Sequence, residues 1–197
     1  MTEAIRAAWD AEADGFDDQP DHGLRDPSVR AAWWSLLSDQ LPAPPVRVLD
    51  VGSGTGSLAV LLAERGYEVV GVELAPRMVD RAVRKARDHA VDVDFRVGDA
   101  ADPLVEGVFD VVLGRHILWA LPDPPLALER WLRLLVPAGR LVLIEGFWHT
   151  GSGITAADLL PILSSRTRAL TWRRLSDEPA LWGGPVSDER YLIVARD

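Results

Sequence analysis

The chain has 197 residues, of which 30 are acidic and 21 basic, and its formal net charge is −9. The absence of cysteine excludes disulfides, thiolate metal ligands and a cysteine nucleophile. The negative charge argues against a nucleic-acid partner. Four histidines, at positions 22, 89, 116 and 149, lack the local pairing of a zinc motif, so we expect no metal.

We expect neither a membrane span nor an export signal. No run of about 18 apolar residues occurs in the sequence. The acidic segment Met1–Phe16 lacks the apolar core of a secretory signal. Lysine occurs once and asparagine not at all, a bias typical of GC-rich bacterial genes. The sequence thus predicts a cytoplasmic bacterial protein without membrane attachment.

The first 45 residues predict helices and turns but no strand. Residues 1–14 form a polar helical pattern, and residues 15–26 are rich in turn formers. A second helix is predicted to begin at Asp26-Pro27, where a capping acid precedes a proline in the first helical position. A proline-rich linker follows at 41–45. We therefore predict a helical lid over residues 1–45 and a single larger domain over residues 46–197.

From residue 46 onward, strand patterns alternate with helical patterns. The strands are predicted at 46–51, 68–73, 92–97, 109–113 and 140–145, and the helices at 57–65, 76–90 and 124–135. This alternation predicts right-handed βαβ units and a mainly parallel sheet. After a helix at 155–164, two strands at 169–175 and 191–195 are joined by a loop, which favours an antiparallel pair.

The glycine-rich turn after the first strand is the most informative motif. It reads Val48-Leu49-Asp50-Val51-Gly52-Ser53-Gly54-Thr55-Gly56. In a doubly wound sheet, ligands bind at the carboxyl ends of the strands, and glycines let the backbone approach them closely. A dinucleotide fingerprint would need a third glycine where Ser57 stands. Asp50 would repel a pyrophosphate, but it suits the ammonium and sulfonium groups of S-adenosylmethionine (SAM).

Two further acids end the next two strands. Glu73 closes the second strand, where a carboxylate can accept hydrogen bonds from both ribose hydroxyls, a feature that NAD sites share. Asp99 follows the third strand and could accept a bond from the adenine amino group. Together with Asp50, these acids predict a site for a cationic nucleoside at one edge of the sheet.

These segments, with Gly98-Asp99-Ala100, Phe109–Leu121 and Leu134–Gly146, resemble the class I SAM-dependent methyltransferases. More narrowly, they resemble the small-molecule type related to the ubiquinone and menaquinone methyltransferases. The resemblance implies an α/β, Rossmann-like fold with helices on both faces of a seven-stranded, mainly parallel sheet. The implied strand order is 3-2-1-4-5-7-6, and the seventh strand is antiparallel.

The resemblance also implies how the cofactor is held. Asp50 and the glycine backbone would hold the methionine end, Glu73 the ribose, and the remaining residues the adenine and the cavity floor. The implied cofactor residues are Asp50, Gly52, Ser53, Gly54, Glu73, Leu74, Asp99, Ala100 and Arg115. Arg115 would contribute through its backbone. The product would be S-adenosylhomocysteine.

The acceptor side is less well defined by the sequence. Phe16-Asp17 stands in the lid where such proteins often carry Tyr-Asp, so that a hydroxyl is missing but ring stacking is retained. We take three histidines as candidates for proton transfer, namely His116, His22 and His149. We take four residues as candidates for contact with the acceptor, namely Phe16, Trp119, Glu145 and Trp148. For each of these the alternative is a purely structural role.

Methyl transfer from SAM is an in-line displacement on an already activated carbon, so the enzyme mainly aligns the acceptor and excludes water. We predict a SAM-dependent methyltransferase that acts on a small-molecule acceptor, and the eight tryptophans favour an aromatic one. The alternatives are an NAD-dependent oxidoreductase of Rossmann type and a non-catalytic SAM-binding module. The sequence leaves open the acceptor, the methylated atom and the oligomeric state.

Overall fold

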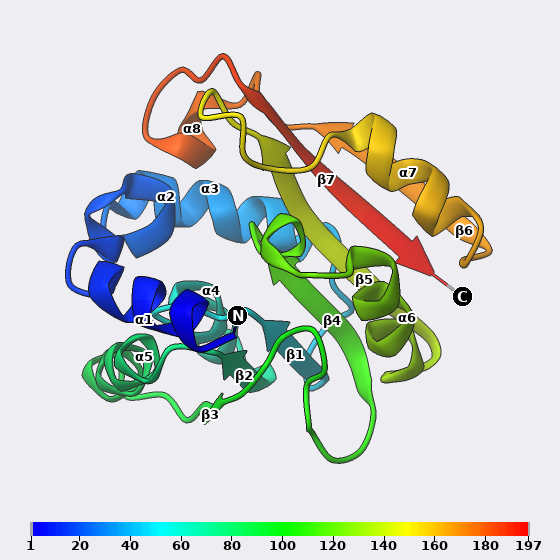
Figure 1. Cartoon of the computed structure of the whole chain (residues 1–197). Helices are drawn as coiled ribbons and strands as arrows, with labels where there is room; N and C mark the ends of the chain where they lie inside the picture. Colours follow the sequence, from blue (N-terminus) through cyan, green and yellow to red (C-terminus); the bar gives the residue numbers. More distant parts are fainter. Residues whose placement is uncertain (1, 197) are drawn as a thin grey trace.

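The computed structural model describes residues 2–196; Met1 and Asp197, which the predicted domain ranges include, lie outside them. Within these residues, seven strands form one sheet in the order β3-β2-β1-β4-β5-β7-β6, with β7 antiparallel to both neighbours (Figure 1). The expected fold class and strand order are confirmed. The strands are β1 Arg47–Val51, β2 Glu68–Glu73, β3 Asp94–Val97, β4 Phe109–Arg115, β5 Leu135–Phe147, β6 Ala169–Arg174 and β7 Glu189–Arg196.

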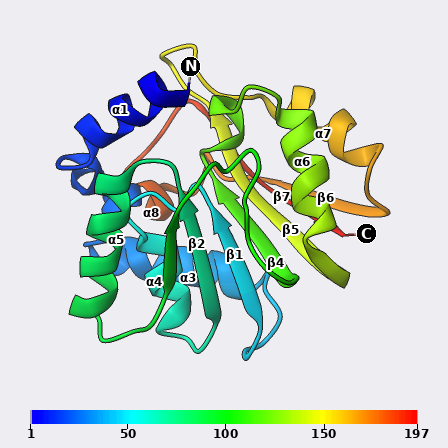
Figure 2. The same ribbon diagram turned by 60° about the horizontal axis from the view of Figure 1, so that its bottom comes forward.

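Helices cover both faces of the sheet (Figure 2). The helices α3, α4 and α8 pack into one apolar cluster against the sheet, whereas α6 and α7 pack into the cluster on the opposite face. The helices are α1 Thr2–Glu12, α2 Pro20–Gly23, α3 Pro27–Ser38, α4 Ser57–Ala63, α5 Pro76–Asp88, α6 Pro124–Arg133, α7 Ala156–Ser164 and α8 Pro179–Trp182, with 3-10 turns η1 Phe16–Asp18 and η2 Leu118–Ala120. No helix within residues 2–196 has the length and apolarity to cross a membrane.

The central strands carry apolar side chains on both faces because both faces of the sheet are covered. In β1, Val48 packs into one cluster and Leu49 into the other, and both are fully buried. Two tryptophans dominate these clusters. Trp33 of α3 and Trp131 of α6 are fully buried, and their indole N–H groups donate to the carbonyls of Leu181 at 2.8 Å and Ala100 at 2.7 Å. Truncating either to alanine should cost about 3–5 kcal/mol. These tryptophans therefore serve the core, which weakens the inference from tryptophan content to an aromatic acceptor.

The observed ends of the helices and strands differ in places from those predicted from the sequence. Asp26 caps α3 as expected, its carboxylate accepting from the amides of Ser28 and Val29. The fifth strand is longer than predicted because its first residue, Leu135, pairs with Phe109 before a register shift in the ladder. The antiparallel pairing of β6 and β7 is confirmed, but the connection contains the short helix α8 where a plain loop was expected.

The N-terminal segment divides into two parts by its contacts. The helix α3 belongs to the core of the sheet, whereas α1, η1 and α2 lie across the carboxyl ends of the strands and line the cavity described below. The separation of a lid at 1–45 from a domain at 46–197 stays a prediction.

Candidate active site

A cavity of about 430 Å³ lies at the carboxyl ends of the strands, under α1, η1 and α2. All nine residues predicted to hold the cofactor line this cavity, as do Phe16, His22, His116, Trp119 and Trp148. The structure thus gathers residues from the lid, from the ends of four strands and from the loop after β5 around one space. Glu145 and His149 are not among the lining residues.

The glycine loop folds back onto β2. The backbone N–H groups of Gly52 and Ser53 both donate to the carbonyl of Val72, at 2.8 and 3.0 Å. Gly52 has a φ of +69°, and a Cβ at this position would lie 2.6 Å from the side chain of Ile117. Only glycine satisfies both conditions, because other residues are strained at positive φ. The loop backbone therefore reaches the cavity wall directly.

Glu73 connects the loop to the start of α5. Its Oε2 accepts from the N–H of Gly54 at 3.0 Å, and its Oε1 accepts from the N–H of Ala75 at 2.9 Å. Burial raises the pKa of Glu73, and these backbone donors act in the opposite direction. Each carboxylate oxygen keeps a second lone pair for a ligand hydroxyl.

Asp50 is a buried carboxylate without a donor. It is 3% exposed, and no residue within 2–196 donates a hydrogen bond to its side chain. Burial raises the pKa of Asp50 to about 7, with Arg115 lowering it and Glu73 adding to the rise. A buried carboxylate of this kind is costly unless a cation or a hydrogen-bond donor reaches it. The end of β1 is therefore suited to a ligand that carries a positive charge.

Arg115 lines the cavity and is half-buried. Its guanidinium donates to the carbonyl of Asp21 in α2 and lies 5.0 Å from the centre of the Trp33 ring. Burial lowers the pKa of Arg115, and the carboxylates of Asp21, Asp50 and Asp17 oppose this shift. The guanidinium thereby joins the lid to the floor of the cavity.

Lys85 of α5 forms a contact that the sequence analysis did not predict. Its Nζ lies 3.1 Å from Asp17 Oδ1, 3.1 Å from Thr55 Oγ1 and 2.6 Å from Ser57 Oγ, and Thr55 Oγ1 also donates to Asp17. The side chain of Lys85 is 14% exposed and that of Asp17 is 6% exposed. Burial lowers the pKa of Lys85 to about 8. This network, which we call the lysine network (Asp17, Thr55, Ser57 and Lys85), connects η1 to the glycine loop and to the start of α4.

Two imidazoles and two indoles form the other end of the cavity. The His22 ring stacks on Phe16 at 4.4 Å between ring centres, and the His116 ring meets Trp148 edge to face at 5.1 Å. Trp119 donates its indole N–H to the carbonyl of His116 at 2.8 Å. Burial lowers the pKa of both histidines, and Arg115 is the next contributor in each case. Burial thus favours the neutral form of both imidazoles.

Glu145 and His149 lie elsewhere than the sequence suggested. Glu145 is fully buried, and its Oε1 accepts from the backbone N–H groups of Ile117 at 3.0 Å and Leu118 at 2.7 Å. Glu145 therefore holds the backbone of the loop that directly follows His116. His149 is exposed in the turn after β5, with its Nε2 3.1 Å from Ser187 Oγ. Neither residue lines the cavity.

The family model described as "Methyltransferase domain" matches residues 49–143. The demethylmenaquinone methyltransferase of Thermus thermophilus is 43% identical over 108 residues, which is 53% of this chain and 49% of that protein. The ubiquinone biosynthesis O-methyltransferase of Xanthomonas oryzae is 36% identical over 137 residues, 68% of this chain and 54% of that protein. The chain belongs to the class I SAM-dependent methyltransferases. It spans about half the length of the curated relatives it matches.

Solved structures agree at the level of the fold. The N-methyltransferase NodS of Bradyrhizobium japonicum, in complex with S-adenosylhomocysteine, superposes with a TM-score of 0.73 at 19% identity, covering 96% of this chain and 98% of that one. The [4+2]-cyclase SpnF has the same TM-score at 22% identity, covering 84% of this chain and 80% of its own. The family match and the neighbour solved with S-adenosylhomocysteine give SAM as the cofactor, and an NAD-dependent oxidoreductase is not favoured. Because a cyclase has the same fold, the fold alone does not define the reaction.

Proposed function

We propose that this protein transfers the methyl group of SAM to a small, aromatic acceptor. The observation that carries the proposal is the position of Asp50. A buried carboxylate that lacks a donor lies beside the glycine loop, in the same cavity as His22, His116, Trp119 and Trp148. The cavity therefore offers an anionic half for a cationic cofactor and an aromatic half for a second molecule.

In the cofactor half, Asp50 would pair with the ammonium group of SAM. Glu73 would accept from the ribose hydroxyls, while Leu74, Asp99 and Ala100 would surround the adenine. This arrangement uses the charge of SAM, because its ammonium and sulfonium groups both favour a nearby carboxylate. A pyrophosphate in this place would instead be repelled by Asp50.

In the acceptor half, the acceptor must be aligned with the methyl group of SAM, and a nearby group must be able to accept one proton. The lone pair of the acceptor attacks the methyl carbon, the carbon–sulfur bond breaks, and its electron pair stays on sulfur. When the acceptor is a hydroxyl or an ammonium group, its proton must leave. Burial favours the neutral forms of His116 and His22, and both have unpartnered ring nitrogens, so either could accept that proton. Ile5, Trp9 and Phe16 of the lid would exclude water from the site.

The size and walls of the cavity favour a small acceptor. A volume of about 430 Å³ is within the range of small-molecule sites. Trp119 and Trp148 form its aromatic walls, with ring centres 5.6 Å apart. The names of the relatives, which refer to demethylmenaquinone and to ubiquinone biosynthesis, support a quinone-like or phenolic acceptor. We place this activity in the cytoplasm.

The proposal is tested by incubating the protein with SAM and a panel of phenols, hydroquinones and aromatic amines. We expect S-adenosylhomocysteine to form together with an acceptor that has gained one methyl group by mass. His116→Gln and His22→Gln should lower turnover more than SAM affinity, whereas the matched control His149→Ala should retain full turnover. Tight SAM binding without product from any acceptor would instead support a non-catalytic SAM-binding module.

A further inference from the structure

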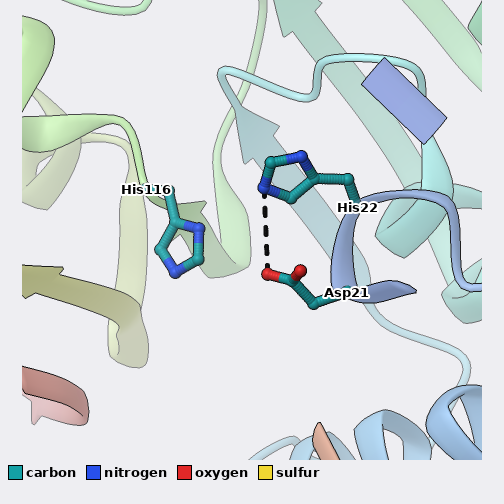
Figure 3. A group of neighbouring side chains, drawn as sticks. All are labelled: Asp21, His22 and His116. Atoms are coloured by element: carbon teal, nitrogen blue, oxygen red, sulfur yellow. Dashed lines mark ion pairs between the residues drawn. The ribbon is translucent and has the colours of Figure 1, made fainter. Parts of the chain in front are cut away.

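Three side chains with metal-ligating atoms meet at the acceptor end of the cavity. Asp21 and His22 belong to α2, and His116 follows β4 (Figure 3). One donor atom from each of the three lies within 4.8 Å of the other two. Asp21 is buried and the two histidines are half-buried. The side chains come from segments that are far apart in the sequence but adjacent at the edge of the sheet.

None of the three polar groups is satisfied by the protein. The carboxylate of Asp21 has contacts of 3.8 Å with His22 Nε2 and with an Arg190 nitrogen, and no residue within 2–196 donates a hydrogen bond to it. The His22 nitrogen that approaches Asp21 is Nε2, whereas the buried nitrogens that have no hydrogen-bond partner among the described residues are His22 Nδ1 and His116 Nε2. Because buried polar groups in native proteins are almost always paired, two imidazoles that each keep an unpaired nitrogen beside a carboxylate without a hydrogen bond indicate room for a ligand.

The chemistry of the three groups selects the type of ligand. A carboxylate oxygen and two neutral imidazole nitrogens offer lone pairs, so the ligand must accept electrons. An anion would be repelled by Asp21. Two histidines with one carboxylate form the donor set of catalytic zinc sites and of sites for Fe²⁺, whereas Mg²⁺ prefers oxygen ligands only. We propose that Asp21, His22 and His116 bind one divalent transition-metal ion at the acceptor end of the cavity.

Two guanidinium groups face this cluster, and each has partners outside it. Arg190 is held by Asp188, with Nε 2.8 Å from Oδ1, and lies 4.3 Å from the Trp182 ring centre. Arg115 faces the carboxylates of Asp21, Asp50 and Asp17, and its hydrogen bond to Asp21 goes to the backbone carbonyl. Neither guanidinium donates a hydrogen bond to the Asp21 carboxylate, whose ion-pair contact with Arg190 is 3.8 Å long.

Such an ion would have two consequences. It would fasten α2 of the lid to the loop after β4, because its ligands come from both. Three protein ligands also leave coordination positions open, as in catalytic zinc sites. Those positions would face the space beside Trp119 and Trp148, where an acceptor oxygen would bind. This second consequence rests on the proposed function, but the binding of the ion does not. The spacing of the histidines in the sequence predicted no metal, since it considers only neighbours along the chain.

The test uses the tag-free, full-length protein after treatment with a chelator. We expect saturable binding of one Zn²⁺ by calorimetry and a visible absorption spectrum with Co²⁺, while Mg²⁺ should not bind. Asp21→Asn, His22→Gln and His116→Gln should each weaken Zn²⁺ binding at least about tenfold, by analogy with the sensitivity of metal sites to their supporting residues. The matched control His149→Ala should bind Zn²⁺ like the wild type.

SAM affinity measured on the same variants separates loss of the metal site from loss of the fold. Retained SAM binding together with weakened Zn²⁺ binding supports the site. The proposal is overturned by the absence of saturable Zn²⁺ binding, or by Zn²⁺ binding that all three variants retain. Methyl transfer that continues in the presence of the chelator, with no Zn²⁺ bound, would contradict a role of the ion in binding the acceptor and would leave the proposed function intact.

Discussion

The pH dependence of SAM affinity follows from the position of Asp50. Burial raises the pKa of Asp50 to about 7 in the unliganded protein. The ammonium group of SAM should bind the ionised carboxylate, so a proton on Asp50 competes with SAM. At pH 6 about one molecule in eleven has Asp50 ionised, and at pH 8 about ten in eleven do. The ionised fraction of Asp50 thus rises about tenfold, while the α-amino group of SAM, with a pKa of about 7.8, loses more than half of its ammonium form by pH 8. The expected affinity for SAM is therefore about fourfold higher at pH 8 than at pH 6, or about 0.8 kcal/mol.

Substitution of Asp50 should remove this dependence. Asp50→Asn has nearly the same shape but no charge, so it loses a charge-assisted interaction of about 1.5–3 kcal/mol. The variant should bind SAM about 10–150-fold more weakly at pH 8, with little change between pH 6 and pH 8. Its unliganded form should not be less stable than the wild type at pH 8. The reason is that a carboxylate with a raised pKa contributes stability below pH 3.8, which is lost as the pH rises through 7.

Calorimetry at pH 6, 7 and 8 and constant ionic strength measures the effect. S-adenosylhomocysteine has the same ammonium group and should show the same slope with pH. Methylthioadenosine, which lacks the amino-acid end, is the matched control and should bind independently of pH. An equal pH dependence for methylthioadenosine, or a flat affinity for SAM, would refute the role given to Asp50.

Three further predictions concern stability. Lys85→Met should leave the buried Asp17 carboxylate without its cation and lower the free energy of unfolding by about 3 kcal/mol. This loss corresponds to a fall in Tm of about 6–12 °C. An unchanged Tm would show that the lysine network does not contribute to stability. Burial raises the pKa of Glu145 to about 8, so its contribution is present below pH 4.5 and lost as the pH rises through 8. The free energy of unfolding of the wild type, measured by urea titration, should therefore fall relative to that of Glu145→Gln as the pH rises over that range. If the two free energies changed with pH in parallel, Glu145 would not be a buried group that ionises there. Gly56→Ala should cost about 3 kcal/mol, because φ is +77° and the new Cβ would lie 2.6 Å from a neighbouring ring. The control Gly151→Ala, at φ +80° with nothing within 4 Å, should cost about 1–2 kcal/mol in the same melting experiment, and equal losses would exclude the steric argument.

The sequence was sufficient to bring the proposed cofactor residues to one cavity because these residues follow consecutive strands. Asp50, Glu73 and Asp99 each come at or just after a strand end, and parallel strands place such ends along one edge of the sheet. The direction of Glu145 could not be predicted in the same way. A central strand buried on both faces has no polar alternation that would show which side chain points to which side.

Lys85 and the metal cluster escaped sequence analysis for different reasons. Met78, Ala82 and Lys85 have the i, i+4, i+7 spacing of one helix face, and Met78 and Ala82 are buried. A closer reading of this spacing would have placed the lysine on the buried side of α5. The approach of His22 to His116, in contrast, depends on how the lid crosses the strand ends. No local pattern reports that contact.

The most direct test of the account is thermal unfolding in the presence of SAM, S-adenosylhomocysteine, NAD and NADP in parallel. A ligand at about 100 times its dissociation constant adds about 2.7 kcal/mol, which raises the Tm of a domain this size by about 5–11 °C. The account predicts this rise with SAM and with S-adenosylhomocysteine and no rise with the two dinucleotides. A rise with NAD or NADP alone, or no rise with any of the four, would contradict it.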